Sequence, residues 1–483
     1  MDHQTSDTRE KSAFRLEHDL IGEMQLPANA YYGIHTARAL ENFAVLGRPC
    51  HPELIKAMAA VKEAAAMTNR ALGLLDAEAG EAICRAAQEI ARGELHEWIC
   101  VDGLQGGAGT SLNMNVNEVL ANRAAELLGC PKGDYRRIHP ADYVNLHQST
   151  NDVFPTALKV AALRLLDRLE AQIARLQLEL QNKEAAFAGI LKMGRTQLQD
   201  ACPTTMGASF GAWAEAISRD RWRVFKCKER LRVINLGGTA IGTGVAAPRD
   251  YIFRVAGALR EITRLNLSRA ENLLDATQNA DVFVEVSGIL KAHAVNLFKI
   301  SSDIRLLASG PRTGLNEIAL APMQAGSSLM PGKVNPVICE AIAQAAMTMM
   351  GHDAAITLAC QSGQLELNAF LPLVAQSLLE GLSGLIAANA AFAERCIATI
   401  GVNADVCAER LENSWAIVTA LVPALGYERA TEIAAAARET GRSVRELARE
   451  TGLIEESELD RLLSPAAMTQ LGYESSKFRT GRR

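Results

Sequence analysis

Residues 326–336 read GSSLMPGKVNP, and this short segment combines the side chains needed to act on a small anion. Ser327 and Ser328 supply hydroxyl groups. Lys333 adds a fixed positive charge, and Asn335 adds an amide. A serine oxygen is a useful base only when its deprotonated form is stabilised, which backbone N–H groups and a nearby cation can do. Two glycines let the segment move and two prolines restrict it, so we predict a loop that closes over a ligand.

Three other segments interrupt the helical pattern with small and hydroxyl-bearing residues: QGGAGTSLNMN (105–115), HPADYVNLHQSTNDVFPT (139–156) and MGRTQLQDACP (193–203). Each lies beside a predicted long helix, so we expect each at a helix start, where free backbone N–H groups and the helix dipole favour an anion. Together with the loop they offer Thr110, Ser149, Thr150, Asn151, Thr196, Ser328, Lys333 and Asn335. Neutral donors with one cation suit a small dicarboxylate better than a sugar or a nucleotide.

Each segment alone also has a simpler interpretation. QSTND is equally the N-cap of a helix that enters at Pro155. GGAGTS lacks the lysine pattern of a phosphate-binding loop, and GGTAIGTG (237–244) lacks both that lysine and the G-x-G-x-x-G spacing, so nucleotide binding is not predicted.

Composition and charge exclude several classes of protein. The 483 residues suggest about two to four domains. Lys+Arg 50 against Asp+Glu 55, without a long run of one sign, argues against a nucleic-acid or membrane partner. The polar first twenty residues contain no secretory signal, so we expect a cytoplasmic protein. The 10 cysteines form no metal-ligand pattern and are expected to be reduced, packed thiols. We expect no metal and no cofactor.

The elements that must position these residues are predicted to be almost entirely α-helical. Aromatic residues make up only 5% of the chain and alanine is abundant, which favours closely packed helices. Between Pro155 and about Gly189, apolar residues recur at alternating steps of four and three, which predicts a helix of roughly 50 Å. Similar patterns recur in 281–308, 337–360 and 373–397. Polar residues interrupt the last stretch, so we predict a buried bundle helix and not a membrane span.

The same patterns divide the chain into three predicted domains, at 1–150, 151–405 and 406–483. The first alternates short helices with glycine-rich loops, and the second holds the long helices. The third contains shorter units, including SVRELARETG, where Ser443 and Glu446 have the spacing of a capping box.

Taken together, these segments resemble the aspartase/fumarase superfamily of lyases, whose signature loop G-S-S-x-M-P-x-K-x-N is matched without a gap by GSSLMPGKVN. The resemblance extends over nearly the whole chain, from NAYYGIHTARALENF (29–43) to SGPRTGLNEI (309–318) and GQLELNAFLP (363–372). It implies three helical domains, with the middle domains of four subunits forming a twenty-helix core. It also implies sites that are built from three subunits of a homotetramer.

The wordings GGAGTS, QSTND and YYGIHT are similar to the ammonia-lyase branch of that superfamily. The reaction implied is reversible loss of ammonia from L-aspartate to give fumarate, with Ser327 as the base. Carried over position by position, the resemblance places Thr110, Ser149, Thr150 and Ser328 at the β-carboxylate, Thr196, Lys333 and Asn335 at the α-carboxylate, and Asn151, with Thr110, at the amino group.

One position departs from the family pattern. The segment commonly written GRTHLQD reads GRTQLQD here, so Gln197 replaces a histidine beside the amino group. A glutamine accepts a hydrogen bond but does not titrate, so it is excluded as the acid that protonates ammonia. Ammonia then leaves as the neutral amine or takes a proton from water. A fumarate hydratase, another C4-dicarboxylate lyase, a lyase for a substituted aspartate and a non-catalytic scaffold remain as alternatives.

Overall fold

The chain is mostly helical, as its composition predicts, in a computed structural model that describes residues 14–473. The α-helices are α1 (Ile34–Asn42), α2 (Pro52–Ala71), α3 (Ala77–Arg92), α4 (Thr110–Leu127), α5 (Thr150–Ala186), α6 (Met206–Leu231), α7 (Arg249–Thr263), α8 (Leu273–Gln278), α9 (Asp281–Leu307), α10 (Val337–Gln361), α11 (Leu371–Ala391), α12 (Ala404–Glu412), α13 (Val422–Leu425), α14 (Tyr427–Thr440), α15 (Val444–Glu450), α16 (Glu456–Leu462) and α17 (Pro465–Thr469).

The strands form two-stranded pairs: β1 (Phe14–Asp19) with β2 (Gly22–Pro27), β3 (Leu191–Thr196) with β4 (Gln199–Thr205), β5 (Val233–Ile234) with β6 (Ser268–Arg269), and β7 (Ile318–Ala319) with β8 (Gly401–Val402). The β3–β4 hairpin corrects one expectation. The segment MGRTQLQDACP was expected at a helix start, but most of it lies in this hairpin, and α6 begins only at Met206. Main-chain pairing of the two strands satisfies the backbone groups that we had assigned to a helix terminus.

The predicted long helix is α5, which begins five residues before Pro155. A proline inside a helix cannot donate to the carbonyl four residues earlier, which here belongs to Asn151. Asn235 replaces the missing donor, since its Nδ2 donates to the Asn151 carbonyl oxygen at 3.0 Å. A contact distant in sequence therefore lets the helix continue back through Pro155 to Thr150.

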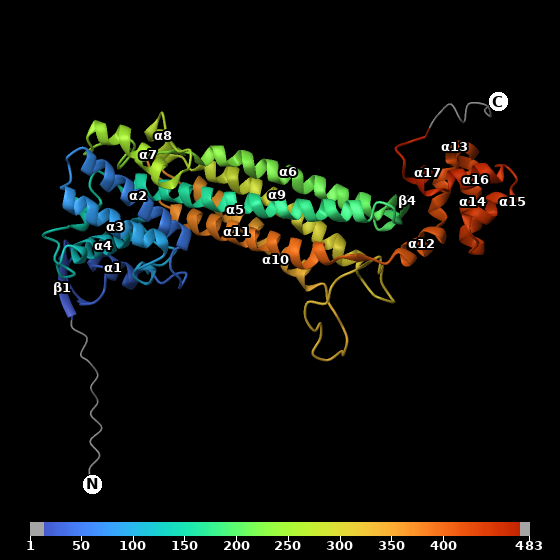
Figure 1. Ribbon diagram of the computed structural model, residues 1–483, viewed down its shortest axis with the longest axis horizontal. Helices are drawn as coiled ribbons and strands as arrows, with labels where there is room; N and C mark the ends of the chain where they lie inside the picture. The colour runs from blue at the N-terminus through green and yellow to red at the C-terminus, as the bar shows by residue number, and fades with distance from the viewer. Residues whose placement is uncertain (1–13, 474–483) are drawn as a thin grey trace, which may run out of the picture. The chain divides into compact units, whose positions relative to one another are not determined.

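The chain divides into two compact units. The first comprises the described residues up to Glu170, together with Trp222–Ala294 and Met347–Ile386. In this unit α2, α3 and α4 pack side by side (Figure 1). Each of these helices contains fully buried alanines, including Ala64, Ala86 and Ala121, and small side chains allow helices to approach closely. The three-domain division drawn from the sequence stays a prediction.

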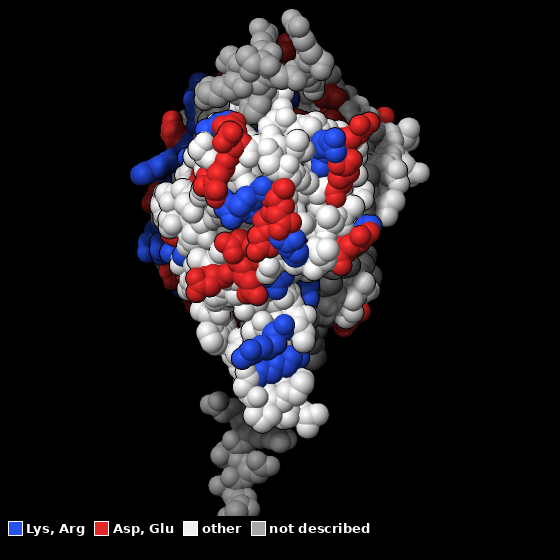
Figure 2. All heavy atoms as spheres, turned by 90° about the vertical axis from the view of Figure 1, so that its right-hand side faces the viewer, with Lys and Arg blue, Asp and Glu red and all other residues white. Residues whose placement is uncertain are grey.

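The second unit comprises Ala171–Arg221, Val295–Ala346 and the described residues from Ala387 onwards. Its C-terminal helices, α14 to α16, enclose an apolar core with the 3-10 segment Trp415–Leu421. The predicted capping box is confirmed: Ser443 Oγ accepts from the Glu446 backbone N–H, and the Glu446 carboxylate accepts in return from the Ser443 N–H. In Figure 2, the side of the molecule that lies at the right of Figure 1 faces the viewer, and acidic and basic side chains lie beside one another on it.

The cysteine prediction is largely confirmed. All ten cysteines lie in the described part of the chain and are free, and six of them are buried. Cys202 is the exception to the expected apolar packing, because it is exposed on β4. The apolar stretch Leu371–Thr399 has the length and composition of a membrane span, but 61% of its most apolar window is buried, as expected for a core helix.

Candidate active site

Two helix N-termini meet in the first unit, and both carry predicted site residues. Helix α4 begins at Thr110 and α5 begins at Thr150. Asn113 joins them, because its Nδ2 donates to Thr150 Oγ1 at 3.1 Å. Gly109, at φ 98°, permits the approach, since a Cβ there would lie 2.2 Å from the Phe154 ring. Two helix dipoles that end at one place favour a bound anion, and the anion site expected at these two segments stays a prediction.

The side chains at the start of α5 have defined donor and acceptor roles. Ser149 Oγ accepts from the Asn151 backbone N–H at 3.2 Å. The Asn151 Nδ2 donates to the Ala240 carbonyl at 2.7 Å. The Oδ1 of the same amide is the atom that remains to accept a hydrogen bond. Thr110 Oγ1 donates to the Gly107 carbonyl at 2.7 Å. The first unit thus holds Thr110, Ser149, Thr150 and Asn151 at these two helix starts.

Asp152 holds the start of α5 through hydrogen bonds to backbone N–H groups, a role that sequence reasoning missed. Its buried carboxylate accepts from the backbone N–H groups of Ser149 at 2.9 Å, Gly237 at 2.9 Å and Thr239 at 3.1 Å. Burial raises the pKa of Asp152 to about 6, although these hydrogen bonds oppose the shift. The segment GGTAIGTG, considered above only for nucleotide binding, therefore supports the start of α5.

A second residue that sequence reasoning missed is Lys62 of α2, which is 0% exposed. Its Nζ donates to Asn145 Oδ1 at 2.8 Å and to Gln148 Oε1 at 2.9 Å. Burial lowers the pKa of Lys62 to about 7, while the negative charge of Asp152 opposes the shift. The available signal was a single lysine inside the apolar stretch AMAAVKEAAAM.

The buried lysine predicts a pH-dependent stability difference between the wild type and Lys62→Met. Between pH 7 and about 10 the unfolded chain holds the Lys62 proton and the folded chain does not, so wild-type stability rises with pH in this window. The stability of Lys62→Met relative to wild type should therefore fall by about 1 kcal/mol per pH unit there. Urea unfolding at pH 6.5 and 9.5 measures the difference. A difference that stays constant with pH, as expected for the partly exposed control Lys56→Met, would contradict the assignment.

The signature loop lies in the second unit and holds its first serine in a defined way. Ser327 Oγ accepts from the backbone N–H groups of Leu329 at 3.1 Å and Met330 at 3.0 Å. Hydrogen bonds donated to an oxygen favour its anionic form. Ser328, the next residue, is exposed. The two serines of the loop therefore differ in their surroundings: the hydrogen bonds donated to Ser327 Oγ favour negative charge on that oxygen, and Ser328 is open to solvent.

Contacts across the base of the loop close it into a ring. The Gly326 N–H donates to the Lys333 carbonyl at 2.8 Å, and Asn335 Nδ2 donates to the Gly326 carbonyl at 2.7 Å. A Cβ at Gly326 would lie 2.5 Å from the Lys333 oxygen, so a side chain would break the ring. Lys333 and Asn335 line a pocket of about 720 Å³ with Arg305 and Glu340. Arg305 is a second cation that the sequence interpretation did not include, and it pairs with Glu340 at 3.4 Å.

Thr196 and Gln197 lie at the tip of the β3–β4 hairpin, also in the second unit. The preceding residue, Arg195, donates to Glu317 Oε1 at 2.5 Å, and Lys192 Nζ lies 3.5 Å from Glu317 Oε2. Glu317 is 0% exposed, so one buried carboxylate anchors the strand that carries Thr196. Although Glu317 lies within the quoted segment SGPRTGLNEI, sequence reasoning gave it no role.

The hairpin turn is strained at Gln197, the residue that replaces the histidine of the family pattern. Gln197 (φ 53°) and Leu198 (φ 63°) both have positive φ, which is the type I′ arrangement usually made by Asn-Gly. Neither residue is a glycine, and a left-handed conformation costs a residue with a Cβ about 1–2 kcal/mol. Because the structure maintains this conformation, the turn fixes the direction in which the Cα–Cβ bond of Gln197 leaves the backbone.

Replacing Leu198 by glycine should relieve this strain. Leu198 is largely exposed, so little apolar burial is lost. We expect Leu198→Gly to raise the free energy of unfolding by about 1 kcal/mol, after allowance for the greater freedom of glycine in the unfolded chain. Chemical denaturation measures the change. The control Leu198→Ala keeps a Cβ and should give no gain; an equal gain in both variants would show that strain is not the cause.

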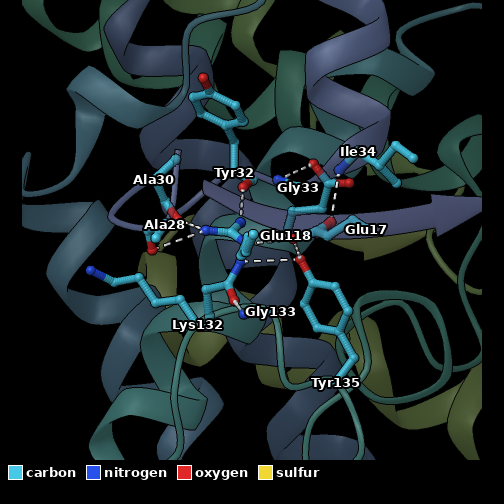
Figure 3. A network of polar contacts seen from close by, with 12 residues as sticks. Glu17, Ala28, Ala30, Tyr32, Gly33, Ile34, Glu118, Lys132, Gly133 and Tyr135 are labelled. Atoms are coloured by element: carbon cyan, nitrogen blue, oxygen red, sulfur yellow. Dashed lines mark hydrogen bonds and ion pairs between the residues drawn. The ribbon is translucent and has the colours of Figure 1, made fainter. Parts of the chain in front are cut away.

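The YYGIHT segment has a structural role in the first unit (Figure 3). Glu118 of α4 accepts from the backbone N–H of Gly33 at 2.8 Å and from Thr36 Oγ1 at 2.6 Å. Burial raises the pKa of Glu118 to about 7. Arg15 donates to the carbonyl of Tyr32 at 2.6 Å. These contacts hold the start of α1 against α4.

Two family patterns match the chain. The family described as "Lyase" matches residues 22–351, and the one described as "Fumarase C C-terminus" matches residues 417–470. With the signature loop, the helical fold and the matched ranges in agreement, the chain belongs to the aspartase/fumarase superfamily of lyases.

Two relatives within that superfamily share one name, aspartate ammonia-lyase. An aspartate ammonia-lyase from a Bacillus species is 46% identical over 463 residues, which is 96% of this chain and 99% of the relative. The aspartate ammonia-lyase of Pseudomonas aeruginosa is 48% identical and covers 94% of this chain and 96% of the relative.

Solved structures agree on the fold. The structure titled fumarate lyase:delta crystallin from Brucella melitensis, bound to cobalt, has a TM-score of 0.92 and 45% identity over 95% of this chain and 100% of that chain. The class II fumarase of Schistosoma mansoni has a TM-score of 0.91 and 32% identity over 94% and 99%.

Proposed function

We propose that this protein is an aspartate ammonia-lyase, which catalyses the reversible deamination of L-aspartate to fumarate and ammonia. The relatives named above carry this activity in their names and align over nearly their full length. The observation that carries the mechanism is the pair of backbone N–H groups that donate to Ser327 Oγ. A serine in this setting is the base of the reaction.

The elimination proceeds in two steps. Ser327, as its alkoxide, takes a proton from the carbon beside the β-carboxylate, and the C–H electron pair moves into that carboxylate to give a dianionic aci-carboxylate. This pair then forms the carbon–carbon double bond as the C–N bond breaks and its electrons leave with nitrogen. Donors aimed at the β-carboxylate accelerate the first step because its charge grows in the transition state.

The site residues divide among three groups of the substrate. Thr110, Ser149, Thr150 and Ser328 surround the β-carboxylate, Thr196, Lys333 and Asn335 bind the α-carboxylate, and Asn151, Thr110 and Gln197 face the amino group. The Asn151 Nδ2 is taken up by the Ala240 carbonyl, which leaves Oδ1 to accept from a protonated amino group.

Gln197 makes no acid available for the departing nitrogen, and the reaction does not require one. An amino group that is protonated when the C–N bond breaks leaves as neutral NH₃, because the bond pair neutralises its charge. Gln197 accepts a hydrogen bond from that group through its carbonyl oxygen. This assignment keeps unsubstituted L-aspartate as the substrate.

We further propose that the protein works in the cytoplasm as a homotetramer and that residues from different subunits form each active site. The superfamily resemblance supports this arrangement. The site residues also fall into two groups that are far apart in sequence, one at the N-termini of α4 and α5 and one in the signature loop and β3–β4 hairpin.

Shared sites predict complementation between two impaired variants. Ser327→Ala and Asn151→Ala, each strongly impaired alone, should regain activity when they are unfolded together and refolded as a mixture. Random assortment of the two subunit types leaves about a quarter of the sites with both wild-type residues. Fumarate production by the mixture is the measurement. A mixture no more active than its components, but tetrameric by light scattering, would contradict shared sites.

The function itself is tested with purified protein, L-aspartate and, separately, L-malate, by following the ultraviolet absorbance of fumarate. We expect fumarate from aspartate alone. Fumarate from malate would assign the chain to the hydratases, and no product from either would indicate a substituted aspartate, for which Gln197 is the first residue to test.

A further inference from the structure

A buried lysine, Lys62, lies behind the proposed β-carboxylate site without a direct counter-ion. Among the described residues, the ion pairs within 4.0 Å include none to Lys62, and the partners of its Nζ are the neutral amides of Asn145 and Gln148. A lysine without a paired carboxylate is costly in the interior, either as a desolvated ammonium or as an amine that has given up its proton. A lysine retained in this position is therefore explained better by a role in the site than by stability.

Lys62 fixes the direction of the hydrogen bonds around it. Its Nζ donates to Asn145 Oδ1, which as an amide oxygen can only accept, so the carbonyl oxygen of Asn145 faces Lys62. That same Oδ1 accepts from Asn113 Nδ2 at 3.2 Å. Asn113 Nδ2 also donates to Thr150 Oγ1 at 3.1 Å. Lys62 therefore sets the donor and the acceptor of each hydrogen bond in this series, which ends at Thr150.

The last link decides what Thr150 can do. Since its oxygen accepts from Asn113, its own hydrogen is left to donate elsewhere. Without Lys62, an asparagine amide can rotate by half a turn and exchange its oxygen and nitrogen. Asn113 would then accept from the Thr150 hydroxyl, which would point away from the site.

We propose that Lys62 is a positioning residue for the lyase reaction: through Asn145 and Asn113 it holds the Thr150 hydroxyl as a donor toward the β-carboxylate of the substrate. This inference rests on the proposed function, because it takes Thr150 to contact that carboxylate. The donated bond strengthens as the aci-carboxylate gains charge. Lys62 thus favours the intermediate more than the bound substrate.

The test compares Lys62→Met with Lys159→Met. Lys159 is also buried, but its Nζ donates to the Val233 carbonyl, outside the chain of bonds that leads to Thr150. For each protein we would measure kcat and KM for L-aspartate and the affinities for two ligands. Succinate represents the ground state. The nitronate form of 3-nitropropanoate represents the intermediate, because its ionised nitro group has the charge and geometry of the aci-carboxylate.

We expect Lys62→Met to lower kcat about 100-fold, the usual loss when one preorganised donor is removed, with much less change in KM. Nitronate affinity should fall in parallel with kcat, and succinate affinity should fall much less. Lys159→Met should keep the wild-type values. A purely structural role of Lys62 would instead weaken both ligands equally.

A second variant covers the case in which Lys62→Met does not fold. Asn113→Leu keeps the lysine but removes the donor to Thr150, and it should show the same selective loss of nitronate affinity. Folded variants with a wild-type ratio of the two affinities would overturn the inference alone. A wild-type protein that forms no fumarate from L-aspartate would overturn the proposed function, and the inference with it.

Discussion

Replacing Ser327 by alanine should lower kcat for L-aspartate by about 10³-fold or more, since the loss of a positioned base commonly costs 10²–10⁴-fold. The two backbone N–H groups that donate to Ser327 Oγ would be left without the oxygen that they stabilise. Binding of succinate should change little, because no part of the proposed α- or β-carboxylate site is removed. Steady-state kinetics and calorimetric titration with succinate measure the two quantities.

The neighbouring serine supplies a matched control. Ser328 lies in the same loop and is assigned a neutral hydrogen bond to the β-carboxylate, which is worth about 1 kcal/mol, so Ser328→Ala should reduce activity by about fivefold. The prediction fails if both serine variants lose the same activity, or if Ser327→Ala keeps a tenth of the wild-type rate.

The second large effect is expected at Lys333. A charged hydrogen bond to the α-carboxylate is worth about 1.5–3 kcal/mol, so Lys333→Ala should lower kcat/KM by about 10- to 150-fold. The backbone of Lys333 closes the loop through its carbonyl oxygen, and alanine keeps that carbonyl, so the ring should survive the substitution. The loss should therefore report on the charge and not on a disordered loop.

Thr196→Ala is the comparison for Lys333→Ala. Thr196 is assigned to the same carboxylate but contributes a neutral donor, worth about 1 kcal/mol, and its loss should cost about fivefold in kcat/KM. Increasing salt should weaken the wild type and Thr196→Ala more than Lys333→Ala, because only they retain the cation. Equal losses in kcat/KM for the two variants would refute the assignment of Lys333.

Several local features followed directly from the sequence because they depend on neighbours along the chain. The capping box at Ser443 was readable from two residues three positions apart. The helix start at Thr110 was readable from small and hydroxyl-bearing residues beside an apolar periodic stretch. The start of α5 was predicted at Pro155 and lies five residues earlier, at Thr150. The hairpin at Thr196 was not readable, because strand pairing between β3 and β4 outcompeted the helix start expected there.

By itself, the sequence determined the chemistry that this protein has available: a loop with a serine, a cation and an amide, and hydroxyl groups at helix starts. Only the tertiary structure decided the direction in which those groups act. Whether Thr150 donates or accepts depends on Asn113, Asn145 and Lys62, and the last of these lies 83 residues from Asn145. Donor and acceptor roles are set by the partners that surround a side chain in space. Lys62 reaches Thr150 only through hydrogen bonds between segments distant in sequence, which residue spacing does not encode.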